Sequence, residues 1–576
     1  MLDLFPCITK CGRVFLSQNP KTASMVQDLV KEGAVEALKK CFSSRMEFGT
    51  AGLRAAMGPG TSCMNDLTII QTTQGFCRYL EESLDNFKKR GVVIGYDARA
   101  HPPSGGSSKR FASLAAAVFI SRGVSVHLFS DIVPTPFVVY WENGAQIVSP
   151  HDKGISKAIE ENLEPWPESW STEEALKSPL LKDPYQDIHT QYFKAIQKHC
   201  HHRDINKSSE VKIVHTSVHG VGHTFVQSAF KAFDLHPPYA VKEQKDPDPE
   251  FPTVKYPNPE EGEGVLTLSF ALAEREGAAV VLANDPDADR LAIAEKQESG
   301  QWRVFSGNEL GALLGWWMFR CWKQQNSDGA AVKNLYMLSS TVSSKILRAI
   351  ALKEGFHFEE TLTGFKWMGN RAKDLLDQGK TVLFAFEEAI GYMCSPFVLD
   401  KDGVSAAAIA GEMISYLATK SSSLSQQVTN IYEEYGYHIS KNSYFICHDQ
   451  DVICSMFERL RSYSGQKDSY PTECGRFSIS AVRDLTTGYD SNQPSNKAVL
   501  PTSRSSQMIT FTFSNGGVAT MRTSGTEPKI KYYTELCAAP GNSDVTHLKK
   551  ELDELVDAIV ENFFEPEKNK LQPKPE

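Results

Sequence analysis

The chain has 576 residues and a formal net charge of -9, from 61 Lys and Arg against 70 Asp and Glu. At about 100–200 residues per domain, this length predicts three to five domains. An acidic chain lacks the broad positive surface that binds nucleic acid or an anionic membrane, so we expect neither as a partner. Small anions held by a few local cations are compatible with this charge.

The cysteines and apolar runs favour a reducing, cytosolic location. Twelve cysteines are scattered along the chain, and Cys7 and Cys11 form a CxxxC pair that we do not expect to bind metal. The longest apolar runs, Phe111–Ile120 and Leu310–Phe319, are shorter than the roughly 20 residues that span a bilayer. The N-terminal stretch lacks a basic start, so we predict neither a membrane span nor a signal peptide.

Three stretches repeat one order: a strand-like run, a polar loop and a helical pattern. In the first, the run Gly91–Ala100 precedes a helical pattern at Lys109–Gly123 and a second strand-like run at Val124–Ser130. The others begin near Val211 and Val332. Such alternation predicts α/β domains with mostly parallel sheets.

The texture changes near Gly436. Shorter strand-like runs follow, at 477–484, 508–513 and 516–523, and then a helical pattern near 547–564, which predicts an α+β C-terminal domain. The charged, Pro-containing residues 567–576 are predicted to be disordered.

A motif of three carboxylates follows the apolar run 278–284. Asp285, Asp287 and Asp289 are spaced i, i+2, i+4, so a turn can bring them onto one hard cation such as Mg²⁺ or Ca²⁺. An EF-hand would need Gly where Arg290 stands and Glu where Lys296 stands. The adjacent arginine favours a phosphate beside the metal, and the alternative is a solvated acidic turn.

Two further loops could bind a sugar phosphate. Arg522–Lys529, with the sequence RTSGTEPK, offers forked donors and a glycine turn, although it could equally be a polar hairpin turn. Glu387 and Glu388 end an apolar strand-like run, where α/β sheets bind ligands, although they could instead be helix N-terminal acids. Arg54 lies in a Gly-rich loop, and no GxxxxGK[ST] sequence is present.

Two other clusters are interpreted as structural. The run His199–His202 lies at the end of a polar helical pattern and is interpreted as a solvated helix terminus. Trp316, Trp317 and Trp322 lie in an apolar helical pattern and are expected in the core.

Taken in order, FGTAGLRA, DPDADR, TGFKWMG, FEEAIGY with LDKDG, and RTSGTEPKIKYY resemble the α-D-phosphohexomutase superfamily of phosphoglucomutases and phosphomannomutases. The sequence around these motifs is similar to that of the phosphopentomutase-type branch, with glucose-1,6-bisphosphate synthase as the alternative. The resemblance implies four domains around a central cleft, three α/β and one α+β. We place the segments at 1–44 (divergent), 45–183, 184–304, 305–424, 425–566 and 567–576 (tail).

The resemblance implies interconversion of the 1- and 5- or 6-phosphates of ribose, deoxyribose or glucose, with Mg²⁺ and a sugar bisphosphate activator, by a chain expected to be monomeric. Asp285, Asp287 and Asp289 match the metal ligands. The catalytic basic positions are Arg54, Arg290 and Lys401, with Lys401 a candidate acid/base group. The substrate-binding positions, besides these three, are Thr363, Gly364, Glu387, Ala389, Arg522, Ser524, Gly525, Thr526 and Lys529. Ala389 stands where hexose mutases have Ser.

One family motif is missing. The phosphorylated serine of the family lies in a T-A-S-H-N-P loop, expected after the PTPF sequence that ends at Phe137. Here Val138 and Val139 lead directly into Tyr140, so a few dozen residues and the nucleophile are absent. Ser149 superficially matches the motif but belongs downstream of the gap. We therefore expect covalent phosphoryl transfer by this chain to be impaired, leaving an inactive sugar-phosphate-binding chain as the alternative to a working mutase.

Overall fold

The computed structural model describes residues 19–138, 141–326, 329–504, 506–524, 528–541 and 544–574, so Cys7 and Cys11 lie outside the described residues. The chain divides into two compact units. Unit 1 comprises residues 1–305, 372–374 and 391–420, and unit 2 comprises 306–371, 375–390 and 421–576. None of the helices in the described ranges is both long and apolar enough to cross a bilayer.

The first part of unit 1 is a small parallel sheet with helices packed on it. The strands run in the order β1-β4-β5, and β1 and β4 pair in parallel through the helix α6, which confirms the first predicted βαβ unit. Helix α4 starts at a capping box on Asn65 and packs against α6 and α7. The elements are α2 (Pro20–Lys31), α3 (Val35–Phe42), α4 (Asp66–Ser83), α5 (Phe87–Arg90), β1 (Val92–Ile94), β2 (Ala100–His101), β3 (Gly106–Ser107), α6 (Ser108–Ser121), β4 (Val126–Leu128), α7 (His151–Glu160), α8 (Thr172–Ala175) and β5 (Leu181–Lys182).

The second part of unit 1 is a sheet in the order β10-β9-β8-β6-β7. Strands β6 and β8 are fully buried and parallel, which confirms the second predicted unit, while β8 and β9 are antiparallel. Helices α11 and α12 pack against β6. The elements are α9 (Tyr185–Ile196), α10 (Arg203–Ser208), β6 (Ile213–Thr216), α11 (Gly222–Ala232), β7 (Tyr239–Ala240), α12 (Glu263–Glu276), β8 (Val280–Asn284), β9 (Leu291–Lys296) and β10 (Trp302–Val304).

Strand β14 (Gly391–Met393) and helix α16 (Gly403–Ala418) also belong to unit 1, although both lie within the predicted segment 305–424. Helix α16 packs against α11, and Gly403 lies against the backbone of Arg290, where an added Cβ would be 2.3 Å from the carbonyl oxygen. This close approach fixes the start of α16 beside the turn between β8 and β9.

Unit 2 begins with parallel strands in the order β12-β11-β13, which confirms the third predicted unit. Helix α13 packs on β13; its Trp317 is fully buried, as expected, whereas Trp316 and Trp322 are half-buried. The elements are α13 (Gly307–Gln325), β11 (Leu335–Ser340), α14 (Ile346–Glu354), β12 (His357–Thr361), α15 (Phe365–Asp377) and β13 (Thr381–Glu387).

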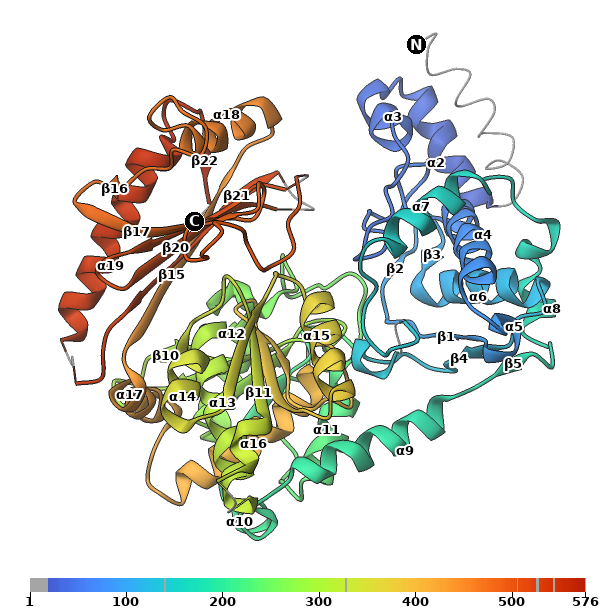
Figure 1. The fold of residues 1–576 in the computed structure, drawn as a ribbon. Coiled ribbons are helices and arrows are strands. Elements are labelled where there is room, and N and C mark those ends of the chain that lie inside the picture. Colours follow the sequence, from blue (N-terminus) through green and yellow to red (C-terminus); the bar gives the residue numbers. More distant parts are fainter. Residues whose placement is uncertain are drawn as a thin grey trace. The chain divides into compact units, whose positions relative to one another are not determined.

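The C-terminal part of unit 2 is a largely antiparallel sheet in the order β16-β17-β19-β20-β21-β15-β22, with α19 running along it (Figure 1). The predicted α+β architecture is therefore correct for this region. The elements are α17 (Leu424–Tyr435), β15 (His438–Ile446), α18 (Gln450–Arg461), β16 (Glu473–Cys474), β17 (Phe477–Asp484), β18 (Tyr489–Asp490), β19 (Met508–Phe513), β20 (Gly517–Thr523), β21 (Lys529–Cys537), α19 (Val545–Ile559) and β22 (Gln572–Pro573).

The prediction of a disordered tail is wrong for the part of the tail that the structure describes. Strand β22 pairs antiparallel with Phe445 and Ile446 of β15. Leu571, immediately before it, is 7% exposed and joins the apolar core beneath the sheet. A single buried leucine and a sheet edge with free hydrogen-bonding groups order this charged segment.

Candidate active site

Three aspartates converge in the turn between β8 and β9. Asp285, Asp287 and Asp289 each offer a carboxylate oxygen, and these atoms lie within 4.8 Å of one another. The turn closes through a hydrogen bond from the Ala288 N–H to the Asp285 carbonyl at 3.0 Å, with Ala288 in the left-handed region at φ 55°. Because a non-glycine residue rarely adopts this conformation, the local backbone is strained to bring the carboxylates together.

Two cations flank the aspartates. Arg290 donates from Nε and from its backbone N–H to Asp285, at 2.9 and 3.1 Å, and the Lys401 ammonium lies 2.9 Å from Asp289 Oδ2. Arg290 also donates to Asn258 at 2.9 Å. Both cations are thus held with their charge directed at the aspartate turn.

The charge balance in the turn favours a bound cation. Burial, reinforced by the neighbouring aspartates, raises the pKa of Asp285 well above its ordinary value. Burial also raises the pKa of Asp289 to about 6, in spite of Lys401. Asp289 Oδ1 is buried and has no hydrogen-bond partner within the described residues. Crowded oxygen ligands with an unused buried lone pair match the donor set of a hard divalent cation.

Two residues that the sequence analysis does not predict act on this turn: Thr135 and Arg99. Thr135 donates from its hydroxyl to Asp287 Oδ2 at 2.8 Å and from its N–H to the Asp287 carbonyl at 3.0 Å. Although burial opposes ionisation of Asp287, hydrogen bonds from Asp285 and Thr135 and the charge of Arg99 lower its pKa. Nothing local in the PTPF sequence indicates that its threonine reaches a residue 152 positions away.

A second group of predicted residues meets in unit 2. The Gly364 N–H donates to the Glu387 carboxylate, and Arg522 Nη1 donates to the Thr363 hydroxyl at 3.1 Å. Arg522 also lies over the Tyr533 ring and donates to its hydroxyl at 3.3–3.4 Å. The predicted sugar and phosphate loops are therefore joined through the Thr363–Arg522 hydrogen bond.

Glu388 is held by hydrogen bonds from two buried serines, Ser343 and Ser340. Ser343 Oγ accepts from the Glu388 N–H at 3.0 Å and donates to its carboxylate at 3.1 Å, and Ser340 Oγ lies 2.7 Å from Ser343 Oγ. Ser340 is 0% exposed and Ser343 is 3% exposed. This reciprocal pair of bonds fixes the end of β13, where Glu387 also lies.

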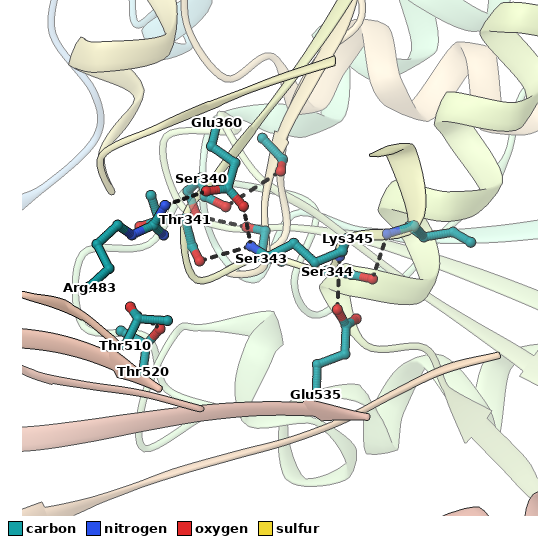
Figure 2. Close-up of polar contacts among 12 residues, drawn as sticks. Ser340, Thr341, Ser343, Ser344, Lys345, Glu360, Arg483, Thr510, Thr520 and Glu535 are labelled. Carbon is teal, nitrogen blue, oxygen red and sulfur yellow. Dashed lines mark hydrogen bonds and ion pairs between the residues drawn. The ribbon is translucent and has the colours of Figure 1, made fainter. Parts of the chain in front are cut away.

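The loop after β11, which carries Ser343, continues into an ion cluster, shown in Figure 2. Glu360 lies between Lys345 and Arg483, at 2.8 and 3.0 Å, and Glu535 accepts from the Lys345 N–H at 2.8 Å. Burial opposes the charge of Glu360, but the two cations dominate and lower its pKa to about 2. The cluster thereby ties the loop after β11 to the C-terminal sheet.

The described residues hold four more predicted positions: Arg54, Ala389, Ser524 and Lys529. Arg54 is exposed, and the described residues show no hydrogen bond from it to the aspartate turn. Ala389 is half-buried. Ser524 donates from its N–H to the Lys529 carbonyl at 2.9 Å, and the Lys529 ammonium lies over the Tyr444 ring. Gly525 and Thr526 lie outside the described residues, as do Val139 and Tyr140.

Ser149 and the histidine run His199–His202 both have structural partners. Ser149 donates to Asp152 at 2.8 Å. The histidine run is half-buried rather than solvated: the N–H groups of His201 and His202 donate to the buried Glu412 carboxylate, each at 2.8 Å. Burial lowers the pKa of His199 to about 4. The prediction of a solvated terminus is wrong because a carboxylate on α16 caps this segment.

Comparison with known proteins decides the family. Residues 45–140, 190–300 and 306–435 match the models of phosphoglucomutase/phosphomannomutase α/β/α domains I, II and III, respectively. The phosphopentomutase of Homo sapiens is 70% identical, over 97% of this chain and 95% of the relative. The chain belongs to the phosphoglucomutase/phosphomannomutase family.

Other members of the phosphoglucomutase/phosphomannomutase family agree with this assignment. The glucose 1,6-bisphosphate synthase of Homo sapiens is 57% identical, over 96% of this chain and 93% of the relative. A crystal structure of parafusin, a phosphoglucomutase from Paramecium, has the same fold, with a TM-score of 0.60, 17% identity, and coverage of 86% of this chain and 90% of that chain. The mixed α/β domains followed by a C-terminal α+β domain are thus the architecture of the family.

Proposed function

We propose that this protein is a phosphosugar mutase of the phosphopentomutase type, acting on the 1-phosphates and 5- or 6-phosphates of ribose, deoxyribose or glucose. The observation that carries the proposal is the aspartate turn flanked by Arg290 and Lys401 in a chain 70% identical to a phosphopentomutase. The lower identity to glucose 1,6-bisphosphate synthase, 57%, makes that activity the second candidate. Cytosolic location and a monomeric state are part of the proposal.

Asp285, Asp287 and Asp289 would hold Mg²⁺. Their oxygen-only donor set, the raised pKa of Asp285 and Asp289, and the buried Asp289 Oδ1, which accepts no hydrogen bond within the described residues, all fit a hard dication. When bound, the cation would supply charge neutralisation for the phosphoryl oxygens.

The chain's own residues bind and orient the substrate. The guanidinium of Arg290, fixed by Asp285 and Asn258, offers its charge to a phosphoryl oxygen. Lys401 Nζ is placed to hold or release the proton of a sugar hydroxyl as the phosphate leaves or returns. Arg54, which is exposed, would bind the reacting phosphate once the substrate is present.

In unit 2 the proposed roles concern the sugar and its other phosphate. The guanidinium of Arg522, held by Thr363 and Tyr533, would bind the phosphate that is not transferred, together with Ser524, Gly525, Thr526 and Lys529. Glu387 would accept from the sugar hydroxyls beside Gly364, and Ala389 offers no hydroxyl of its own. A sugar bisphosphate of the glucose 1,6-bisphosphate type would serve as activator.

We propose further that this chain binds its substrate but does not form a phosphoenzyme. The family's serine motif is absent from the sequence between Phe137 and Ser149. The alignment with the human phosphopentomutase extends over 585 positions, although this chain has 576 residues, so the relative has positions without a counterpart here. With no hydroxyl nucleophile in place, the bisphosphate cannot be regenerated from the enzyme.

Titration calorimetry with ribose 5-phosphate in the presence of Mg²⁺ tests the binding part of this proposal. We expect saturable binding that R522A weakens at least tenfold, because the guanidinium makes forked, charge-assisted bonds to phosphate. R476A, which removes an exposed arginine that pairs with Glu554, is the matched control. Equal binding by R522A and R476A would refute the assigned role of Arg522.

A further inference from the structure

Thr135 makes two hydrogen bonds to a single residue of the aspartate turn. Its hydroxyl donates to Asp287 Oδ2 at 2.8 Å, and its N–H donates to the Asp287 carbonyl at 3.0 Å. The first bond fixes the rotation of the carboxylate, and so the place of its other oxygen. The second fixes the backbone from which that carboxylate projects.

Thr135 is itself held rigidly. It begins a short 3₁₀ turn, Thr135–Phe137. It lies between Pro134 and Pro136, and these prolines restrict the backbone. Phe137 is 3% exposed, and its ring lies 4.6 Å from the Tyr192 ring and 5.0 Å from the Phe225 ring. Because two helices, α9 and α11, grip the phenylalanine, the threonine hydroxyl is presented to Asp287 in one position.

The other side of the turn is braced in a similar way. The Val221 N–H donates to the Pro286 carbonyl at 2.9 Å, and a Cβ on Gly220 would lie 2.3 Å from Pro286 Cα. Val221 directly precedes α11, the helix on which Phe225 lies. Helix α11 therefore supports Thr135 through Phe137, and the residue directly before α11 supports Pro286, which precedes Asp287. This shared support restricts movement of the threonine relative to the turn.

We propose that Thr135 is a positioning residue for cation binding, because it orients the ligand Asp287. The proposal rests on the assignment of Asp285, Asp287 and Asp289 as metal ligands. Outer hydrogen-bond partners of metal ligands typically change metal affinity by 10- to 100-fold when removed. Thr135 precedes the shortened junction, so this support of the metal site is retained in a chain that lacks the serine loop.

The test measures Mn²⁺ affinity by titration calorimetry, together with the melting temperature without metal. T135V keeps the shape of the side chain and removes the hydroxyl, and we expect at least tenfold weaker Mn²⁺ binding. T135S restores the hydroxyl and should restore the affinity. The matched control is T190V, because the hydroxyl of Thr190 is exposed on α9 and bonds locally to the Gln186 carbonyl.

The outcomes separate the two claims. A T135V chain that melts earlier but binds Mn²⁺ as tightly as T190V would show a purely structural role and overturn the proposal. Failure of T135S to restore affinity would also overturn it. Absence of Mn²⁺ binding by the unchanged chain would overturn the metal assignment and the Thr135 proposal together, whereas equal affinity of all four chains refutes the role of Thr135 alone.

Discussion

Removal of the Glu360 charge is expected to destabilise unit 2 strongly. The carboxylate is 20% exposed and lies within 3.0 Å of both Lys345 and Arg483. These cations lower its pKa from the ordinary 4.5 to about 2, against the opposing effect of burial. At about 1.4 kcal/mol for each tenfold change in acidity, this lowering corresponds to about 3 kcal/mol of stability.

The E360Q variant should therefore lower the melting temperature of unit 2, of roughly 240 residues, by about 6–12 °C at pH 7. Because the pKa is depressed in the folded state, this stability is present above the unfolded pKa near 4.5. It is lost as the pH falls toward 2. The unchanged chain should lose this contribution between about pH 5 and pH 2, and E360Q should lack that part of the pH dependence.

Differential scanning calorimetry from pH 7 to about pH 2 measures both effects. E434Q is the matched control, because Glu434 pairs with Lys353 at the surface of unit 2, where such pairs contribute about 0–1 kcal/mol. Equal shifts for E360Q and E434Q, or the same acid dependence in E360Q as in the unchanged chain, would refute the assignment of a strong buried cluster.

Two further substitutions test the site. S343A removes the hydroxyl that bonds both the N–H and the carboxylate of Glu388, so a loss of about 1–3 kcal/mol is expected by calorimetry, and an unchanged melting temperature would contradict it. K401M removes the cation that competes for Asp289 Oδ2, so Mn²⁺ should bind about three- to tenfold more tightly by titration calorimetry. Weaker Mn²⁺ binding by K401M would instead make the lysine part of the support for the cation.

The local sequence pattern was sufficient to predict the candidate site where all of its ligands lie in one short segment. The i, i+2, i+4 spacing of Asp285, Asp287 and Asp289 predicted convergence, and the structure shows it. Periodicity likewise identified the strands that became β6, β8, β11 and β13, since these are apolar and buried.

Partners distant in sequence could not be predicted in this way. Thr135 and Asp287 are 152 residues apart, and their hydrogen bond exists only because two helices position the turn that begins at Thr135. Strand β15 was missed because its outward residues, such as Lys441 and Asn442, interrupt the apolar pattern, and its pairing with β21 supplies the stability that the pattern does not reveal.

The sequence also does not indicate to which unit α16 belongs. Its sequence is mostly apolar, with Glu412 as its one charged residue, so the pattern predicts a buried helix without indicating which sheet it covers. The close approach of Gly403 to the Arg290 carbonyl, together with the packing of α16 on α11, assigns it to unit 1. Lys401, two residues earlier, reaches Asp289 for the same reason.

The central claim is that this chain keeps its binding sites and lacks the covalent step. The most direct measurement is a coupled mutase assay with ribose 1-phosphate and a glucose 1,6-bisphosphate activator. It compares the chain as it stands with a chain into which the corresponding segment of the human phosphopentomutase is inserted after Val138. We predict no measurable turnover for the first and ordinary turnover for the second. Turnover at an ordinary enzymatic rate by the unaltered chain would contradict the account.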